Sequence, residues 1–261
     1  MGNIIKKIFR KFKLLQLLIR FGYPRTKILF DQFKYSKRIK ERAFIKDKYR
    51  EIAYKKYGLR FSEQCDVGEV IFEDIYTQYP DFIPNNKDFV IDVGAQYGDY
   101  AILCNKFYKA RVTAFEPLLK NYELFKRNIK LNLINDAKIK LYNFALGSTN
   151  KTTYLSYSGD MVHKWKSKDV QKVVLKRLDV FKLKPTILKI DVEGFEMEVL
   201  AGAIKTLRRY HPKIIIEVHS TDLKNKVLKM LSAFGYKVRH EGRVIINKES
   251  EMDFVQNLFL Y

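Results

Sequence analysis

The chain has 261 residues, of which 47% are hydrophobic and 14% aromatic, which suffices for one packed domain with an appendage. Its two cysteines, Cys65 and Cys104, exclude a disulfide framework and a four-cysteine zinc site, and they favour a reducing, cytoplasmic setting. No apolar run reaches the roughly 18 residues of a membrane-spanning helix, and lysines interrupt the N-terminal apolar patches where a signal peptide needs a continuous one.

Positive charge is concentrated at the N-terminus. The net charge is +21, and residues 1–60 hold 19 Lys and Arg against 4 Asp and Glu. Residues 4–21 show apolar positions at helical spacing, with basic residues mostly on the other face. Such a helix can lie on an anionic membrane, contact nucleic acid or pack on the protein with its lysines in water. A second helix is expected over residues 35–57, ending at Gly58. We expect a basic helical N-terminal extension over residues 1–60 and a main domain over residues 61–261.

The first predicted βαβ unit has a strand at Phe89–Val93, a helix at about residues 97–107 and a strand at Arg111–Phe115. Asp92 stands at the end of the first strand, and Glu116 directly follows the second. Small residues in the turn after the first strand let the backbone approach a ligand without Cβ clashes: Gly94, Ala95 and Gly98. A carboxylate at the position of Glu116 can accept hydrogen bonds from ribose hydroxyls. The pattern is typical of a Rossmann-like unit that holds an adenosine-containing cofactor.

The turn differs from that of a dinucleotide-binding protein. Pyrophosphate binding uses G-x-G-x-x-G, but the second and third glycine positions hold Gln96 and Asp99. Asp92 would repel a pyrophosphate and suits a ligand with a cationic amino group. These details favour S-adenosylmethionine, and the alternative role of Asp92 is to cap the following helix.

Strands and helices alternate through the rest of the chain, which predicts a parallel sheet with helices on both faces. The segment Gly68–Tyr76 is expected to be an extended or mixed entry to the main domain, and a helix follows Pro117. Further strands are expected at Ile139–Phe144, Ile187–Ile190, Ile214–Val218 and near residues 237–239 and 254–258, with helices at Phe195–Arg208 and Leu223–Phe234. Residues 151–178 interrupt the alternation. They are predicted to form a β-rich insertion whose polar loop offers His163 and Trp165 as candidate acceptor contacts.

Ionisable residues gather where the later strands end. Asp191 follows the fourth strand, and Glu217 and His219 lie at the end of the fifth. Ligands of open α/β sheets bind beyond the carboxyl ends of the strands. Converging charges are costly there unless they contact a ligand, a metal or each other. We therefore expect Asp191 and His219 to be functional, whereas Glu196 and Glu198 on the next helix are expected to face solvent.

Four segments of the chain carry a more specific signal. They are Lys189-Ile190-Asp191-Val192-Glu193-Gly194-Phe195-Glu196, Leu200-Ala201-Gly202-Ala203, Ile216-Glu217-Val218-His219 and Leu231 to Tyr236. In order and spacing the chain resembles, over roughly residues 68–245, the FkbM family of S-adenosylmethionine-dependent methyltransferases. Gln96 stands where the family usually has Asn, so an amide is kept. The resemblance implies an α/β fold with a Rossmann-like, seven-stranded class I methyltransferase sheet. It also implies methyl transfer to a hydroxyl oxygen of a natural product or sugar.

The resemblance also implies positions for the cofactor, S-adenosylmethionine. The three small residues of the first turn would admit its methionyl part, and Asp92 would contact its amino group directly or through water. Glu116 would hold the ribose hydroxyls. The turn containing Asn143 and Ala145 would border the adenine through backbone contacts.

Methyl transfer to an alcohol needs a base, because the pKa of a hydroxyl lies far above neutrality. His219 is the first candidate, since the ordinary pKa of imidazole, about 6.5, suits proton removal near neutral pH. Asp191 and Glu217 could orient His219 or serve instead. The same three residues could hold a divalent metal, because oxygen-rich ligand sets suit hard ions, but we assign no metal from the sequence. The expected acceptor is a hydroxyl group on a glycan, a lipid-linked sugar or a small natural product.

An RNA methyltransferase that uses the basic N-terminal region is the alternative function. The charge and the run Asn128-Ile129-Lys130-Leu131-Asn132 support it. The absence of an Asn-Pro-Pro-Tyr-type motif after the fourth strand argues against it, as does the absence of a recognisable RNA-binding module. A peripheral contact of residues 4–21 with an anionic membrane would instead bring the enzyme to glycan or lipid-linked acceptors at the cytoplasmic face.

Overall fold

A computed structural model of the chain describes residues 38–135, 137–156, 161–162, 170–242 and 255–261. The helix expected over residues 4–21 lies outside the described residues, as do His163 and Trp165. The chain divides into two compact units, residues 1–45 and 46–261. The sheets and the cavity described below belong to the second unit. The division at residues 60 and 61 stays a prediction.

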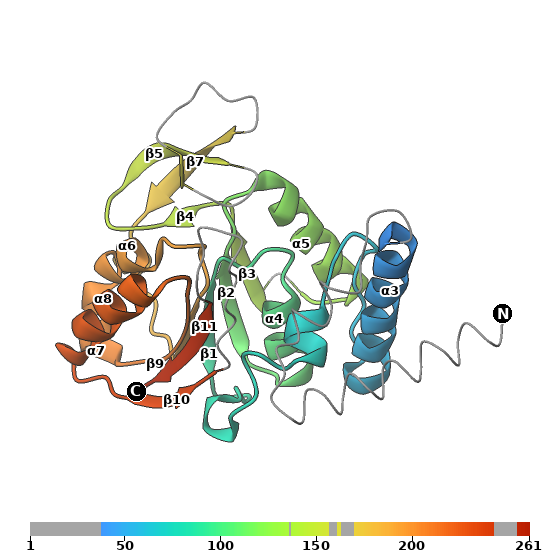
Figure 1. Ribbon diagram of the computed structural model, residues 1–261, viewed down its shortest axis with the longest axis horizontal. Coiled ribbons are helices and arrows are strands. Elements are labelled where there is room, and N and C mark those ends of the chain that lie inside the picture. The colour runs from blue at the N-terminus through green and yellow to red at the C-terminus, as the bar shows by residue number, and fades with distance from the viewer. Residues whose placement is uncertain (1–37, 136, 157–160, 163–169, 243–254) are drawn as a thin grey trace. The chain divides into compact units, whose positions relative to one another are not determined.

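A seven-stranded sheet forms the centre of this unit (Figure 1), with the strand order β10-β11-β9-β8-β1-β2-β3. Its strands are β1 (Phe89–Val93), β2 (Arg111–Phe115), β3 (Ile139–Tyr142), β8 (Ile187–Ile190), β9 (Lys213–Val218), β10 (Val238–Glu241) and β11 (Gln256–Leu260). The first five run parallel, and β11 pairs antiparallel with β9 and with β10. The predicted Rossmann-like, seven-stranded α/β fold is confirmed.

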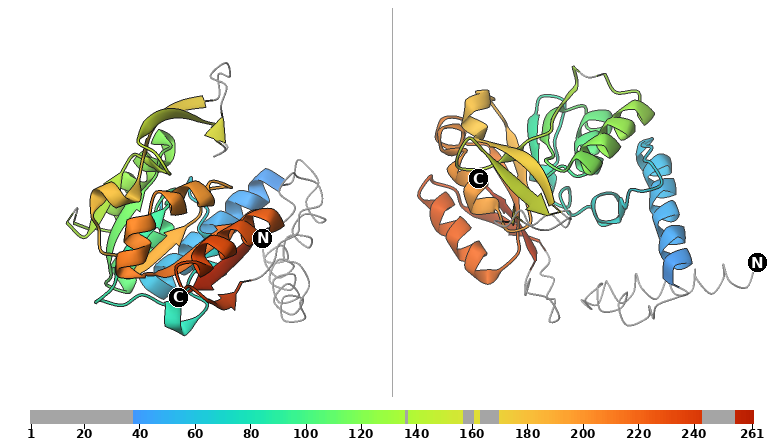
Figure 2. Two further views of the ribbon diagram at one scale, coloured as in Figure 1. Left: turned by 90° about the vertical axis from the view of Figure 1, so that its left-hand side faces the viewer. Right: turned by 90° about the horizontal axis from the view of Figure 1, so that it is seen from above.

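Alternating side chains of the strands build two cores, one on each face of the sheet. In β9, for example, Ile215 belongs to one buried cluster, while Ile214 and Ile216 belong to the other. The first cluster is covered by the helices that follow β1 and β2 and the second by those that follow β8 and β9 (Figure 2). These helices are α4 (Asp99–Ile102) with a π-helical turn (Leu103–Phe107) and α5 (Leu119–Leu131), then α6 (Glu196–Ala201), α7 (Ile204–Tyr210) and α8 (Thr221–Ser232).

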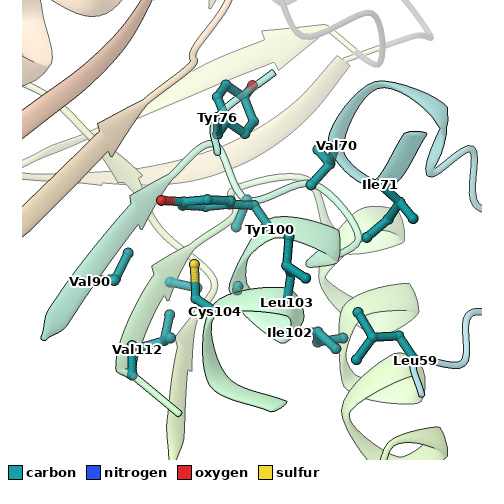
Figure 3. Packing of buried hydrophobic residues seen from close by; sticks show 14 of the residues in the cluster. Leu59, Val70, Ile71, Tyr76, Val90, Tyr100, Ile102, Leu103, Cys104 and Val112 are labelled. Carbon is teal, nitrogen blue, oxygen red and sulfur yellow. The ribbon is translucent and has the colours of Figure 1, made fainter. Parts of the chain in front are cut away.

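The segment before the sheet completes the first core. The end of α3 (Arg38–Tyr57) confirms the expected second helix, and its residues Ala53 and Tyr57 are buried in this cluster. The segment expected to be extended or mixed contains a π-helical turn, Gly68–Phe72, followed by a 3₁₀ turn at Pro80–Phe82. Figure 3 shows its Val70 and Ile71 beside the helical residues after β1.

One predicted helix is two helices in the structure. The pattern from Phe195 to Arg208 is divided into α6 and α7 at Gly202, because Asp179 binds the start of the second helix from outside. Its carboxylate accepts hydrogen bonds from the backbone N–H of Lys205 at 3.0 Å and of Thr206 at 2.9 Å. Asp179 lies in a 3₁₀ turn, Leu178–Phe181, which the periodicity of the helix itself does not reveal.

The β-rich insertion is confirmed as a separate four-stranded sheet with the order β4-β7-β5-β6. Its strands are β4 (Ala145–Leu146), β5 (Lys151–Ser156), β6 (Met161–Val162) and β7 (Val170–Lys176). The predicted third strand ends at Tyr142 rather than Phe144, because the chain leaves the main sheet to pair Ala145 and Leu146 with β7. Cys65 and Cys104 are buried and unpaired. In the part of the chain that the structure describes, no helix offers an apolar stretch of membrane-spanning length.

Candidate active site

A cavity of about 340 Å³ opens at the carboxyl ends of β1, β2, β8 and β9. Its volume lies in the range of small-molecule sites, about 300–1,000 Å³. The turn after β1 forms one wall through Gly94, Ala95 and Gln96, and the start of the second sheet contributes Ala145 and Leu146. The cavity lies where the strand order of an open α/β sheet places a ligand.

The lining is acidic although the protein as a whole is strongly basic. Among the described residues, seven carboxylates and one lysine line the cavity: Asp66, Glu69, Asp99, Glu116, Asp191, Glu193, Glu217 and Lys189. Such a lining favours a cationic ligand and disfavours a pyrophosphate.

Glu116 is held rigidly at the end of β2. Its Oε1 accepts a hydrogen bond from the backbone N–H of Leu118 at 2.9 Å, and its Oε2 accepts one from Gln96 at 2.8 Å. Burial raises the pKa of Glu116 to about 7, although these backbone hydrogen bonds oppose the shift. Each oxygen has a second lone pair for a ligand hydroxyl. The residue is therefore placed as the sequence predicted.

The glycines of the turn are needed mainly for packing within the protein. Gly94 has φ +75°, and a Cβ there would lie 1.7 Å from the carbonyl oxygen of Asp191. At Gly98, with φ +81°, a Cβ would lie 2.1 Å from the ring of Phe125. Gly94 and Ala95 line the cavity, whereas Gly98 is absent from the lining. Gly98 thus supports the turn from behind.

Asp92 lies beneath the cavity rather than in its wall. It is fully buried and is paired in register with Lys189 on the adjacent strand β8. The Nζ of Lys189 stands 3.2 Å from Asp92 Oδ1 and donates to the carbonyl oxygen of Gly94 at 3.0 Å. Burial opposes the charge of Lys189, yet Asp92 and Asp191 raise its pKa above the ordinary value. The structure therefore presents Lys189 to the cavity where the sequence suggested Asp92.

Asn143 and Ala145 occupy different positions. The amide of Asn143 donates to the carbonyl oxygens of Glu116 at 2.8 Å and Pro117 at 2.9 Å, so it supports the loop after β2. Ala145 lines the cavity beside Phe144. Of this predicted turn, Ala145 contacts the cavity and Asn143 holds the backbone around it.

The opposite end of the cavity contains Asp191 and Glu217. The hydroxyl of Tyr76 donates to Asp191 Oδ2 at 2.8 Å, and Lys189 Nζ lies 3.6 Å from the same oxygen. Asn257 on β11 donates to Glu217 Oε2 at 3.1 Å. Both carboxylates are thus fixed by side chains from other segments.

His219 is surrounded by carboxylates and is 6% exposed. Its Nδ1 lies 3.1 Å from Glu196 Oε1, and its Nε2 lies 3.3 Å from Glu193 Oε2 and 3.4 Å from Glu217 Oε1. Although burial lowers it, the contacts with Glu196, Glu217 and Glu193 raise the pKa of His219 to about 11. An imidazole that faces carboxylates at both nitrogens is a donor at both. With a carboxylate at each ring nitrogen, His219 offers no free lone pair for proton removal.

The structure corrects the position of Glu196. The residue was expected to face solvent, but it is fully buried and also accepts a hydrogen bond from the backbone N–H of Gly194 at 3.0 Å. Helical periodicity did not distinguish its face from that of Glu198. Lys189 and Tyr76 were also missed as site residues. The register of Lys189 beside Asp92 on two parallel strands was the available signal, whereas nothing in the sequence links Tyr76 to Asp191.

One set of described residues has the geometry of a metal site. Asp191, Glu217 and His219 each offer one ligand atom, and these atoms all lie within 4.8 Å of one another. They are the three residues that the sequence grouped as catalytic.

The family model of the methyltransferase FkbM domain matches residues 92–238, which is more than half of the chain. The chain belongs to the FkbM methyltransferase family. The matched part of the chain is a methyltransferase domain whose cofactor is S-adenosylmethionine. The acidic cavity fits a cofactor with a sulfonium and an ammonium group, and Glu116 fits its ribose.

The chain spans about three fifths of the length of AglP, the first curated relative described. It is 29% identical to the hexuronic acid methyltransferase AglP of Haloferax volcanii over 155 residues, which cover 56% of this chain and 62% of AglP. It is 25% identical to the methyltransferase sdnD of Sordaria araneosa over 223 residues, covering 66% of this chain and 83% of sdnD. The crystal structure of the methyltransferase FkbM from Methylobacillus flagellatus has a TM-score of 0.50 at 17% identity, covering 70% of this chain and 51% of that one, and shares the fold.

Proposed function

We propose that this enzyme methylates a hydroxyl oxygen of a glycan, a lipid-linked sugar or a small hydroxylated natural product. The observation that carries the proposal is the group of carboxylates at one end of the cavity: Glu69, Asp191, Glu193 and Glu217. Carboxylates accept hydrogen bonds from hydroxyl groups and can take up their protons. They are the partners that a polyhydroxylated acceptor needs.

The opposite end of the cavity would hold the cofactor. Glu116 would accept hydrogen bonds from the ribose hydroxyls, and the backbone around Gly94 and Ala95 would lie along the methionyl part. Lys189 would face the methionyl carboxylate, with Asp92 fixing the lysine from below. Ala145 would border the adenine. When bound, the cofactor supplies a methyl group on a positively charged sulfur.

The residues of the chain would then align the acceptor and receive its proton. The oxygen of the acceptor must lie in line with the methyl group and the sulfur, so positioning supplies most of the rate enhancement. The side chain of Glu193 is 42% exposed, against 22% for Asp191 and 15% for Glu217, and Glu193 would accept the proton of the hydroxyl. His219 would hold Glu193 and Glu217 in place, because its Nε2 lies 3.3 Å from the first carboxylate and 3.4 Å from the second.

An acceptor hydroxyl fits this site better than an acceptor carboxylate. Hexuronic acids, the substrates named for AglP, carry both groups. A carboxylate placed among Glu69, Asp191 and Glu193 would be repelled, whereas a hydroxyl would be stabilised by them. The proposed product is therefore an ether and not an ester.

The proposal is tested by tracing a labelled methyl group from the cofactor to its acceptor. The protein is incubated with methyl-labelled S-adenosylmethionine and with separated glycan, lipid and RNA fractions, and labelled products are treated with mild alkali. We expect label in the glycan or lipid fraction that survives alkali, because methyl ethers resist hydrolysis and methyl esters do not. Alkali-labile label would indicate ester formation, and label confined to RNA would support the alternative function. Either result would overturn the proposal.

A further inference from the structure

Negative charge gathers around Nε2 of His219. Asp191 and Glu217 come from the ends of two adjacent strands, and their oxygens converge with Nε2 within 4.8 Å. A positive charge between these atoms is needed to offset their repulsion.

The distances from Nε2 of His219 to its two carboxylate neighbours are longer than those of typical charge-assisted hydrogen bonds. Hydrogen bonds between a cationic nitrogen and a carboxylate are about 2.7–2.9 Å long. The Nε2 of His219 lies 3.4 Å from Glu217 Oε1 and 3.3 Å from Glu193 Oε2. Ligand atoms about 2.1 Å from one ion stand roughly 3.0 Å apart at right angles and roughly 3.4 Å apart in a tetrahedron. The 3.4 Å between Glu217 Oε1 and His219 Nε2 therefore matches two ligands in a tetrahedral arrangement and exceeds the right-angle value by about 0.4 Å.

All three candidate ligands are also held from behind. Glu196, which is fully buried, contacts Nδ1 of His219 at 3.1 Å and so directs Nε2 toward the cavity. Metal-binding histidines almost always have such a carboxylate or carbonyl on the other ring nitrogen. Tyr76 fixes Asp191 at 2.8 Å, and Asn257 fixes Glu217 at 3.1 Å. The contact of Glu196 with Nδ1 is separate from the convergence of the three ligands, and it also indicates a metal site at Nε2.

We propose that Asp191, Glu217 and His219 bind one divalent cation. Carboxylates suit Mg²⁺ and Mn²⁺, while imidazole also suits Zn²⁺, so Mn²⁺ is the ion that best matches the mixed set. Nε2 of His219 would bind the ion through its lone pair, so metal binding requires this nitrogen to be without a proton. Three protein ligands leave coordination positions open toward the cavity.

The role of the ion rests on the proposed function, whereas its binding does not. An acceptor hydroxyl that occupies an open position would have a lower pKa, because the ion stabilises the oxygen as it loses its proton. Glu193 lies outside the three-ligand set and stays available to receive that proton. The oxygen then forms its bond to the methyl carbon as the carbon–sulfur bond breaks, with the electron pair of that bond passing to sulfur.

Binding is tested on the full-length protein with Mn²⁺ alone, followed by electron paramagnetic resonance and by calorimetry. We expect one Mn²⁺ per chain. Asp191→Asn and Glu217→Gln should each weaken binding at least about tenfold, and Glu196→Gln about 10–100-fold. Glu123→Gln, at an exposed carboxylate that pairs with Lys126, is the matched control and should leave Mn²⁺ affinity unchanged.

Calorimetry with S-adenosylmethionine, carried out in parallel, separates this proposal from the proposed function. A wild-type protein that binds the cofactor but takes up no Mn²⁺, Mg²⁺ or Zn²⁺ would overturn the metal site alone. Undiminished Mn²⁺ uptake by Asp191→Asn and Glu217→Gln would overturn it as well, because the ion would then lie elsewhere. If a variant fails to fold, the wild-type protein still tests the location of the ion. Mn²⁺ bound at this site must broaden the NMR signals of the His219 ring, and unchanged signals would overturn the site.

Discussion

At the scale of single residues, burial controls the charge of the cofactor end of the cavity. Asp99 and Glu116 are both nearly inaccessible, and burial raises the pKa of each to about 7. Neither carboxyl group has a cation in ion-pair contact among the described residues. We therefore expect a positively charged cofactor to stabilise the ionised forms of both carboxyl groups.

This burial predicts how stability depends on pH. The pKa of Glu116 is raised from 4.5 to about 7 on folding, so the folded protein holds more protons than the unfolded chain in that range. Stability contributed by the neutral group is therefore present below pH 4.5 and is lost as the pH rises to 7 and beyond. Because Glu116→Gln cannot ionise, the unfolding free energy of the wild-type protein should fall relative to the variant by about 3 kcal/mol between pH 4.5 and pH 8. Urea unfolding at several pH values measures this difference, and a constant difference would contradict it.

A second residue-scale prediction concerns proton transfer. Glu193→Gln removes a carboxylate that is exposed to the cavity without removing a contact to the cofactor end. We expect kcat to fall about 100-fold or more, while the affinity for S-adenosylmethionine stays within about twofold. Steady-state kinetics on the acceptor identified by methyl labelling gives the first value and calorimetry the second. Unchanged turnover would exclude Glu193 as the proton acceptor.

The sequence predicted which residues lie at the site more reliably than how they contact one another. Glu116 and Asp191 directly follow strands and Glu217 lies at the end of β9, and the rule that ligands bind at the carboxyl ends places all three in the cavity wall. His219 lies behind that wall, and its three carboxylate neighbours could not be inferred from strand position. Its assignment as a base used an ordinary pKa that holds only without those neighbours.

At the scale of elements, α7 depends on a residue outside it. The side chain of Asp179 is 4% exposed and receives hydrogen bonds from two backbone N–H groups and from the hydroxyl of Thr206. The first turn of a helix has no intrahelical partners for its N–H groups, so such a carboxylate stabilises it and matches the helix dipole.

Replacing this cap should destabilise the whole domain. We expect Asp179→Ala to lower the free energy of unfolding by about 1–3 kcal/mol, because buried donors lose their acceptor. Asp179→Asn should cost less, since the amide oxygen still accepts one of the hydrogen bonds. Chemical denaturation of the wild type and the two variants measures their free energies of unfolding and so gives the order of stability. Equal stability of wild type and Asp179→Ala would show that α7 does not need this contact.

Element boundaries were predictable where the cause is local. The strand bounds Phe89–Val93, Arg111–Phe115 and Ile187–Ile190 agree with the structure, because each is a short apolar run between a polar start and an acid or loop. The break between α6 and α7 has a distant cause, since Asp179 lies more than twenty residues earlier in the chain. The π-helical turn at Gly68–Phe72 likewise has no pattern of its own in the sequence.

At the scale of the whole molecule, charge is divided between a basic chain and an acidic cavity. The net charge of +21 contrasts with seven carboxylates and one lysine around the cavity among the described residues. Residues 1–22 contain six Lys and Arg and no Asp or Glu. We therefore predict that the acidic cavity binds the cationic cofactor and that the basic N-terminal residues approach an anionic surface.

Membrane association is therefore predicted to depend on residues 1–22 alone. Each basic residue near an anionic surface contributes about 1 kcal/mol. We expect the full-length protein to bind phosphatidylserine-containing vesicles at moderate salt and a variant lacking residues 1–22 to bind them far less. Both proteins should bind S-adenosylmethionine equally, because the cavity is formed by later residues. Vesicle sedimentation tests the first statement, and equal sedimentation of both proteins would refute it.

We infer that the cavity beyond β1 and β2 holds S-adenosylmethionine through Glu116. Calorimetric titration of the wild-type protein and of Glu116→Gln, with S-adenosylmethionine, its demethylated product, NADH and ATP as separate ligands, tests it most directly. We expect one saturable site for S-adenosylmethionine, with an affinity about tenfold or more lower in Glu116→Gln. We expect no comparable binding of NADH or ATP. Absence of S-adenosylmethionine binding to folded wild-type protein, with NADH or ATP saturating the cavity instead, would contradict it.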